Sequence, residues 1–177
     1  MKNILFFLLS SALVLFTACS DDGDALFVDN SSASLTIDGV AYSKAEDYVV
    51  SFSNITFNDE ETFQVNGTMA NGTDTVSFSL DIPNFNVATY TQANNGDEVT
   101  LSIRFEESFE SYSSDPFTFG DIDRSAIDYE IAITASNEDN VNGTFSGTLM
   151  NSDGETVEVD GEFVAINALA ALGNLID

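Results

Sequence analysis

Carboxylates beside aromatic side chains are the residues of this chain whose types could support acid–base chemistry. One segment holds four acids and three aromatic residues: Glu106, Glu107, Phe109, Glu110, Tyr112, Asp115 and Phe117. A glycosidase needs two carboxyl groups that flank the scissile bond, and this segment offers several candidates. However, the chain contains 30 Asp and Glu residues, so some acids are expected beside aromatics by chance, and it contains no Trp. We therefore expect no catalytic residue, with a glycoside hydrolase as the alternative.

Oxygen-rich loops are the second candidate, because Ca²⁺ prefers several oxygen ligands. Asp121, Asp123 and Asp128 form one such group, and residues 137–140 (Asn-Glu-Asp-Asn) form another. Neither fits the EF-hand pattern, in which glycine stands at the sixth loop position and ligands at the first and twelfth. Calcium bound by Asp121, Asp123 and Asp128 is a hypothesis, and the simpler interpretation is a solvated acidic loop with no cofactor.

Composition excludes two classes of function. The chain has no histidine, which rules out a Ser-His-Asp triad and a histidine-ligated metal site. Its formal net charge is −26, with four Lys and Arg, so nucleic acid is not expected as a partner, because phosphate binding needs clustered cations. Hydrophobic residues make up 44% of the chain and include 15 Phe, which predicts a packed core.

The single cysteine, Cys19, follows an uncharged apolar run over residues 4–16 that has a lysine before it. This run has the length of a signal-peptide core and is shorter than the roughly 20 residues of a membrane-spanning helix. Thr17 and Ala18 are small residues of the kind that precede signal-peptidase cleavage. The simplest interpretation is an ordinary secretory signal in which the cysteine is incidental.

The residues Leu15-Phe16-Thr17-Ala18-Cys19 resemble the bacterial lipoprotein signal, in which the cysteine thiol receives a diacylglycerol and the chain is cut before it. This resemblance implies lipid attachment at Cys19, which anchors the protein in a membrane and leaves no thiol for a disulfide. The following Ser20, Asp21 and Asp22 resemble the acidic export signal of surface-exposed lipoproteins in Bacteroidetes. That resemblance implies an outer-membrane location facing the cell exterior, and the alternative is a solvated tether.

Apolar and polar residues alternate through most of the chain after residue 33, which predicts β-strands. Hairpins are expected at Asp38-Gly39, Asn71-Gly72 and Ser152-Asp153-Gly154. The Asn-Gly-Thr triplets that begin at residues 66, 71 and 142 are all interpreted as turns. A shift of the apolar phase near Ser53-Asn54 predicts a β-bulge.

These elements predict an all-β fold, an antiparallel β-sandwich or flattened barrel of about 8–10 strands with a short C-terminal helix over 168–176. The predicted organisation is a signal peptide over 1–18, a lipidated acidic tether over 19–32 and a single β domain over 33–177. The aromatic residues expected to be exposed for ligand binding are those outside the clean strands: Tyr90, Tyr112 and Phe117.

The last predicted strand pair holds residues 142–147 (NGTFSG) and 157–163 (VEVDGEF). It resembles the terminal hairpin of uncharacterised β-rich lipoproteins of Bacteroidetes, which implies the same fold class and no catalytic residue. Asp74-Thr75-Val76 matches the short pattern at which these bacteria link glycans to threonine, which makes Thr75 a candidate for O-glycosylation.

The expected function is that of a cell-surface lipoprotein, a non-enzymatic binding or structural module of the envelope. Its expected partners are the membrane, through the lipid anchor, and a glycan or another envelope protein. The alternative is a carboxylate-dependent glycan-active enzyme or a calcium-binding accessory protein in glycan uptake.

Overall fold

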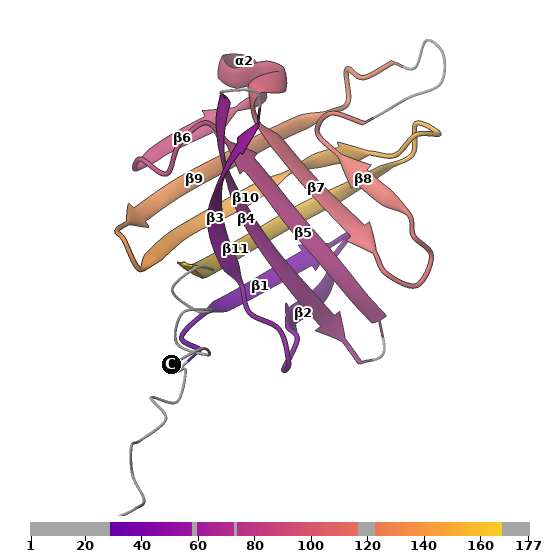
Figure 1. Ribbon diagram of the computed structural model, residues 1–177. Coiled ribbons are helices and arrows are strands. Elements are labelled where there is room, and N and C mark those ends of the chain that lie inside the picture. The colour runs from indigo at the N-terminus through magenta and orange to yellow at the C-terminus, as the bar shows by residue number, and fades with distance from the viewer. Residues whose placement is uncertain (1–28, 58–59, 73, 117–122, 168–177) are drawn as a thin grey trace, which may run out of the picture.

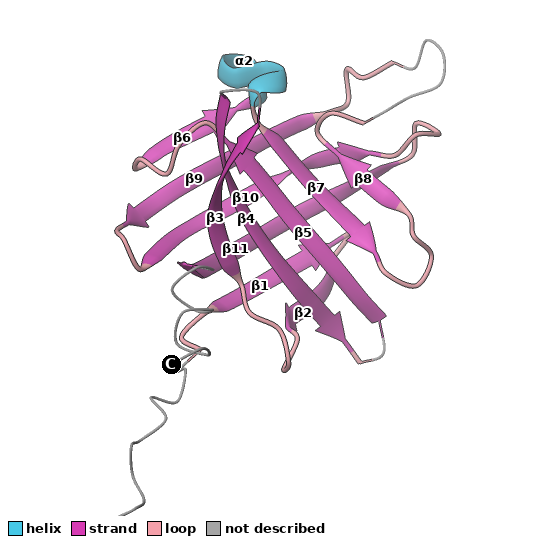
Figure 2. Cartoon of the chain, in the orientation of Figure 1, coloured by secondary structure: helices cyan, strands magenta, loops and turns pink. Residues whose placement is uncertain are grey.

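The computed structural model describes residues 29–57, 60–72, 74–116 and 123–167, and these residues form an 11-stranded sheet (Figures 1 and 2). Besides the strands, they form one short helix, α2 (Gln92–Asn95), and a 3-10 turn, η1 (Gly96–Glu98). The all-β class that the alternating pattern predicted is confirmed. Within the described part of the chain, no helix has the length and hydropathy to cross a lipid bilayer.

The sheet folds into two layers, which we call the six-stranded layer and the five-stranded layer. The six-stranded layer contains, in spatial order, β2 (Val40–Lys44), β1 (Ser32–Ile37), β11 (Thr156–Asn167), β10 (Asn140–Met150), β9 (Asp128–Ser136) and β6 (Ala88–Thr91). The five-stranded layer contains β3 (Ser51–Phe57), β4 (Glu60–Asn71), β5 (Asp74–Ile82), β7 (Thr100–Phe105) and β8 (Ser111–Ser113). In Figure 1 the five-stranded layer lies in front, and its strands cross those behind at a large angle.

Short pairings join the two layers at their edges. Lys44 of β2 pairs with Met69 of β4, and Ser113 of β8 pairs with Met150 of β10. These two junctions close the strands into a ring, so the fold is a flattened barrel rather than two separate sheets. β3 and β11 also pair, in parallel, which makes the sheet mixed instead of antiparallel throughout.

All three hairpins that were predicted from turn residues are present. Asp38 and Gly39 both have positive φ, 48° and 80°, as the tight turn between β1 and β2 requires. Gly72 lies in the turn between β4 and β5, and Gly154 lies in the loop between β10 and β11; both have positive φ. Local turn chemistry therefore decides these connections.

The interpretation of the Asn-Gly-Thr triplets at 66 and 142 as turns is wrong. Gly67 lies inside β4 and Gly143 lies inside β10, where each pairs with a phenylalanine of the neighbouring strand. A Cβ at Gly67 would overlap the ring of Phe78, and one at Gly143 would lie 2.7 Å from Phe163 Cζ. These glycines are needed because a ring fills the space of the missing side chain.

The predicted bulge near Ser53-Asn54 is also wrong, because β3 and β4 pair without interruption from Ser51 to Phe57. Residues 55–57 pair with residues 60–62, a part of β4 that β5 does not reach. The register shifts instead between β9 and β10, at Asn142 and Gly143.

Two short strands, β6 and β8, were not predicted, and they carry Tyr90 and Tyr112. These tyrosines are only 5% and 7% exposed, so the prediction that they form an exposed aromatic surface is wrong. A tyrosine can bury its ring in the core while its hydroxyl keeps a hydrogen-bond partner. Tyr90 Oη donates to the carbonyl oxygen of Asn84 at 2.9 Å. Phe117 and the predicted helix over 168–176 lie outside the described residues.

The last residues of the predicted tether pack against the domain. Lys44 Nζ lies 2.6 Å from Asp29 Oδ2, and the backbone N–H of Val50 donates to the buried hydroxyl of Ser31 at 3.0 Å. Burial opposes ionisation of Asp29, but hydrogen bonds from Lys44 and Ser31 outweigh it and hold the pKa of that carboxyl below its ordinary value. The packed domain therefore begins before residue 33.

The core between the layers is organised around three phenylalanines. Phe78 of β5, Phe145 of β10 and Phe163 of β11 have ring centroids 5.2 to 6.4 Å apart. Each ring also covers a glycine of the adjacent strand: Gly67, Gly161 and Gly143 respectively. The rings thus pack on bare backbone and on one another, which joins both layers.

This packing predicts the cost of adding one methyl group. Gly67→Ala should lower the free energy of unfolding by about 1–3 kcal/mol, because the new Cβ overlaps the Phe78 ring in a filled core. Chemical denaturation would measure the change. The cost should shrink when Phe78→Leu is already present, because the pair is in contact. An equal cost in both backgrounds would contradict this account.

Candidate functional site

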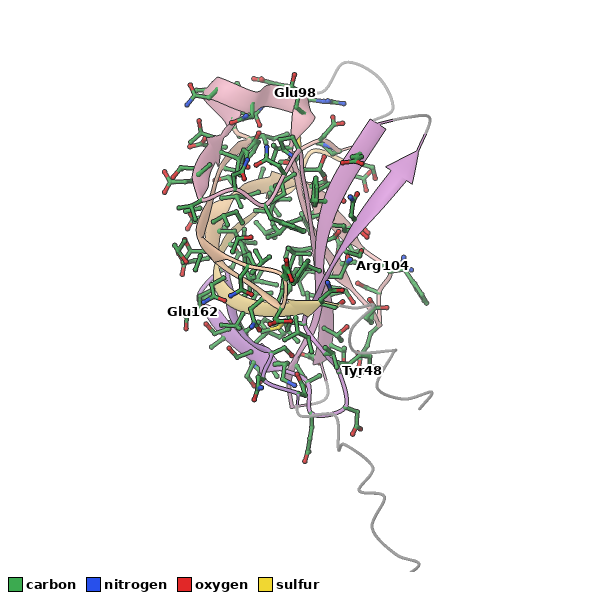
Figure 3. All side chains as sticks on the ribbon, turned by 60° about the vertical axis from the view of Figure 1, so that its left-hand side comes forward. Tyr48, Glu98, Arg104 and Glu162 are labelled. Atoms are coloured by element: carbon green, nitrogen blue, oxygen red, sulfur yellow. The ribbon has the colours of Figure 1, made fainter. Side chains whose placement is uncertain are left out.

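The outward faces of the two layers differ in charge. Five exposed acids of β9 and β11 lie on the six-stranded layer: Asp128, Glu130, Glu158, Asp160 and Glu162. Figure 3 shows Glu162 on that side, and Arg104 and Tyr48 on the opposite side. The five-stranded layer therefore presents the less acidic surface of the two.

The outward side chains of β4, β5, β7 and β8 form a surface that we call the polar face. Its residues are Gln64, Asn66, Thr68, Thr75, Ser77, Ser79, Asp81, Thr100, Ser102, Arg104, Ser111 and Ser113. Ten of these twelve residues are uncharged, and the charges of the other two, Asp81 and Arg104, are opposite. Strand pairing aligns them in rows, of which Asn66, Ser79, Ser102 and Ser113 form one. Neighbouring strands lie roughly 4.8 Å apart, so the rows repeat hydroxyl and amide groups at close intervals.

A groove of about 450 Å³ runs across the polar face. Small hydroxyl residues line it, among them Thr68, Ser77 and Ser102, together with Asn66 and Arg104. These side chains supply both donors and acceptors of hydrogen bonds without burying a charge. A second hollow, of about 320 Å³, adjoins it, and Ser111 lines both.

Arg104 is the cation of the groove, and its surroundings are unusual for so acidic a chain. Lys44 pairs with Asp29, and Arg124 pairs with Asp115 at 3.1 Å. Arg104 makes no ion pair with any residue that the structure describes. The residue is exposed and pairs with Ser77 and Ser111 in strand register. Its guanidinium carbon lies 5.2 Å from the ring centroid of Phe109, a cation–π contact.

Phe109 closes the turn between β7 and β8 in a strained conformation. The backbone N–H of Phe105 donates to the carbonyl oxygen of Glu110 at 2.9 Å, which leaves residues 106–109 as the loop. Phe109 has φ of 58°, in the left-handed region that favours glycine and costs a bulky residue about 1–2 kcal/mol. Its ring is 69% exposed, so burial does not repay that cost.

Two of the acids considered for glycoside hydrolysis, Glu106 and Asp115, are held by local bonds. Glu106 Oε1 accepts the hydroxyl of Ser77 at 2.6 Å, and Asp115 pairs with Arg124. Glu107 is exposed on the β7–β8 turn. Hydrogen bonds of this kind fix a carboxylate in place and leave fewer lone pairs for a substrate.

Glu110 belongs to a network that stabilises β8. Its Oε1 atom accepts the phenol of Tyr112 at 2.7 Å and the side-chain amide of Asn151 at 3.1 Å. The same amide donates to Glu155 Oε2 at 3.2 Å. Burial and the bond to Glu110 raise the pKa of Tyr112 to about 12. Tyr112 therefore remains a donor that holds Glu110.

The proposed calcium ligands are only partly within the described residues. Asp121 lies outside them, and Asp128 is exposed at the start of β9. Asp123 caps its own turn: the backbone N–H of Ser125, at 2.9 Å, and the Ser125 hydroxyl lower the pKa of its carboxyl. Within the described ranges, no three acids, cysteines or histidines converge on one point.

Residues 137–139 form the turn between β9 and β10, which begins at Asn140, and several of their oxygens accept hydrogen bonds within the fold. Asn137 Oδ1 accepts the backbone N–H groups of Asp139 and Asn140 at 2.9 and 2.8 Å. Asn167 at the end of β11 donates to the carbonyl oxygens of Glu138 and Asp139. Hydrogen bonds within the fold therefore fix this acidic turn.

The remaining candidates concern modification and export. Cys19, Ser20, Asp21 and Asp22 lie outside the described residues. Thr75 lies in β5 on the polar face with a half-buried side chain, and its carbonyl oxygen accepts the backbone N–H of Glu106 at 3.0 Å. Sequence reasoning did not select Arg104 or Phe109. The alternating pattern of β7 indicates that the Arg104 side chain points outward. That Arg104 forms no ion pair with a described acid could be learned only from the fold.

Three comparisons with known proteins, by family model, by sequence and by structure, found no match for this chain.

The strain at Phe109 predicts that two substitutions which both remove the ring differ in stability. Phe109→Gly should raise the free energy of unfolding by about 1 kcal/mol relative to Phe109→Ala, because both remove the ring but only glycine relieves the left-handed backbone. Denaturant unfolding of the two variants measures this difference. Equal stabilities would show that the turn carries no such strain.

Proposed function

We propose that this protein is a lipid-anchored module of the outer cell surface that binds a glycan through its polar face and catalyses no reaction. The observation that carries the proposal is the separation of charge between the two outward faces. Exposed acids gather on the six-stranded layer, while hydroxyl and amide side chains cover β4, β5, β7 and β8.

Hydrogen-bond chemistry supports a polyhydroxylated ligand. Ser, Thr and Asn side chains both donate and accept, which matches sugar hydroxyls that do the same. Binding at such an interface removes water from few charged groups. This lowers its cost, because burying a charge without a partner is unfavourable. The groove of about 450 Å³ has the size of a small-molecule or single-sugar site.

A protein partner is less well supported by the surface. Protein interfaces concentrate aromatic and apolar side chains at a buried centre. Among the described residues, the exposed large hydrophobics lie apart along the chain: Val40, Tyr48, Val87 and Phe109. None of these four residues lines the groove.

The anchor is the first part of the proposal to test. Cys19→Ala should abolish acylation, because the thiol is the proposed attachment point, and the protein should leave the detergent phase. Metabolic labelling with a fatty acid would measure this. Asp21→Ala with Asp22→Ala should keep the lipid and reduce protease access on intact cells. A Cys19→Ala protein that still carries lipid would refute the anchor.

The polar face is tested by placing charge on it. Ser79→Glu with Ser102→Glu should weaken retention on a polysaccharide that binds the wild type by about tenfold or more, which corresponds to about 1.4 kcal/mol. These residues pair directly on the polar face. Affinity electrophoresis through a panel of neutral and acidic polysaccharides would measure retention.

The matched control adds the same charge to the other layer. Thr89→Glu with Ser136→Glu alters two exposed residues of β6 and β9 and should leave retention unchanged. Equal losses in both double variants would indicate a general charge effect. Absence of retention on every polysaccharide would refute glycan binding.

A further inference from the structure

Arg104 stands out because, among the described residues, it forms no ion pair although acids are abundant. The chain contains 30 acids and four Lys and Arg residues, and Lys44 and Arg124 are each paired with an aspartate. The described contact of the Arg104 guanidinium is with a phenyl ring, and its partners in strand register are Ser77 and Ser111. The carboxylate of Glu106 accepts the hydroxyl of that same Ser77 but makes no ion pair with Arg104. Among the described residues, the fold thus leaves one cation without an ion pair on a face whose acids are Asp81 and, at the edge of the groove, Glu106.

We propose that Arg104, which lines the groove, and Phe109, which lines the adjoining hollow, form a carboxylate-binding subsite where the two meet, and that the ligand is a polysaccharide that carries uronic acid residues. This inference rests on the proposed glycan binding by the polar face and names the class of glycan. Arg presents a planar fork of N–H donors that matches the two oxygens of a carboxylate.

Phe109 gives the subsite a fixed guanidinium and an apolar surface. A ring 5.2 Å from the guanidinium carbon restricts the side chain that must receive the anion, so less freedom is lost on binding. Most of the phenyl ring remains exposed and is available to the C–H groups of a sugar. The strained φ of Phe109 keeps the ring at this place, although glycine would close the turn at lower cost.

The groove supplies the hydrogen bonds that a sugar needs beside its carboxylate. Ser102, Ser111 and Thr68 carry hydroxyls in the lining, and Asn66 carries an amide. The Ser77 hydroxyl is already donated to Glu106 at 2.6 Å, so this carboxylate lies at the edge of the same groove. Glu106 therefore repels a second anion and favours a ligand with one carboxylate per sugar over a densely sulfated chain.

The test uses ligands that differ only in charge. Polygalacturonate, alginate and hyaluronate are each compared with their carboxyl-reduced forms in affinity electrophoresis and calorimetry with the full chain. We expect at least one uronate polymer to bind about tenfold or more tightly than its reduced form, and we expect this preference to fall as salt rises. Dextran sulfate is the sulfated comparison and should bind more weakly.

Four variants assign the preference to the subsite. Arg104→Gln should abolish it, and Arg104→Lys should restore it only in part, because an ammonium lacks the planar fork. Glu106→Gln should raise affinity for the uronate. Arg124→Gln is the charge-matched control, since Arg124 pairs with Asp115, which lines the second hollow but not the groove, and its removal should leave binding unchanged. Thermal melting confirms that each variant is folded.

Several results would overturn the proposal and separate it from the proposed function. Equal binding of the charged and reduced polymers, or equal effects of Arg104→Gln and Arg124→Gln, would refute the carboxylate subsite while glycan binding stands. Binding of dextran sulfate alone would also refute it. Absence of binding to every polymer would refute both.

Discussion

The packing of three phenyl rings on backbone glycines is the contact on which the two-layer arrangement depends. Phe78 comes from the five-stranded layer, whereas Phe145 and Phe163 come from the six-stranded layer. Each ring lies over a glycine of the neighbouring strand in its own layer, so the rings pack close to the backbone and contact one another between the layers. The same contacts fix the strand register, since a slip by one residue would bring a side chain under a ring and turn the inward residues out.

The position of the polar face follows from that register. In β5, buried Val76, Phe78 and Leu80 alternate with Ser77 and Ser79, so anchoring Phe78 inward directs the serines outward. Pairing with β4 and β7 then aligns those serines with Asn66, Arg104 and Ser102. A surface built of short side chains on a regular sheet is therefore a consequence of how the core is packed.

Sequence reasoning succeeded where a local signal and the tertiary structure agree. Alternation predicted β5, β7 and β9, and Asp38-Gly39 predicted its hairpin because positive φ is required there. The same Asn-Gly signal at residues 66–67 and 142–143 was misleading, since those glycines serve ring packing within strands. A glycine in the sequence shows that the backbone there can adopt a positive φ or accept a close neighbour. Long-range contacts decide which of the two occurs in the fold.

The short strands β6 and β8 show a different limit. Each contains one buried tyrosine, Tyr90 or Tyr112, and a strand of three or four residues is too short to display a period. Tyr112 is held by Glu110, an acid that the sequence offered equally well as a catalytic group. The role of such an acid depends on partners from distant segments, here Asn151, and these cannot be read from spacing.

The candidate site combines a predictable feature with one that required the structure. Alternation within β7 places Arg104 outward beside inward Ile103, and this could be read from the sequence. The left-handed Phe109 could not, because the loop over residues 106–109 contains no glycine or asparagine to mark it. Fold stability does not account for an exposed phenyl at a position where glycine would be less strained. The described contact of that ring with a charged group is with Arg104, so the energy stored in the turn holds a surface pair in place. A pair maintained at such a cost, at the edge of a groove of hydroxyl side chains, is better explained by an external ligand than by the stability of the barrel.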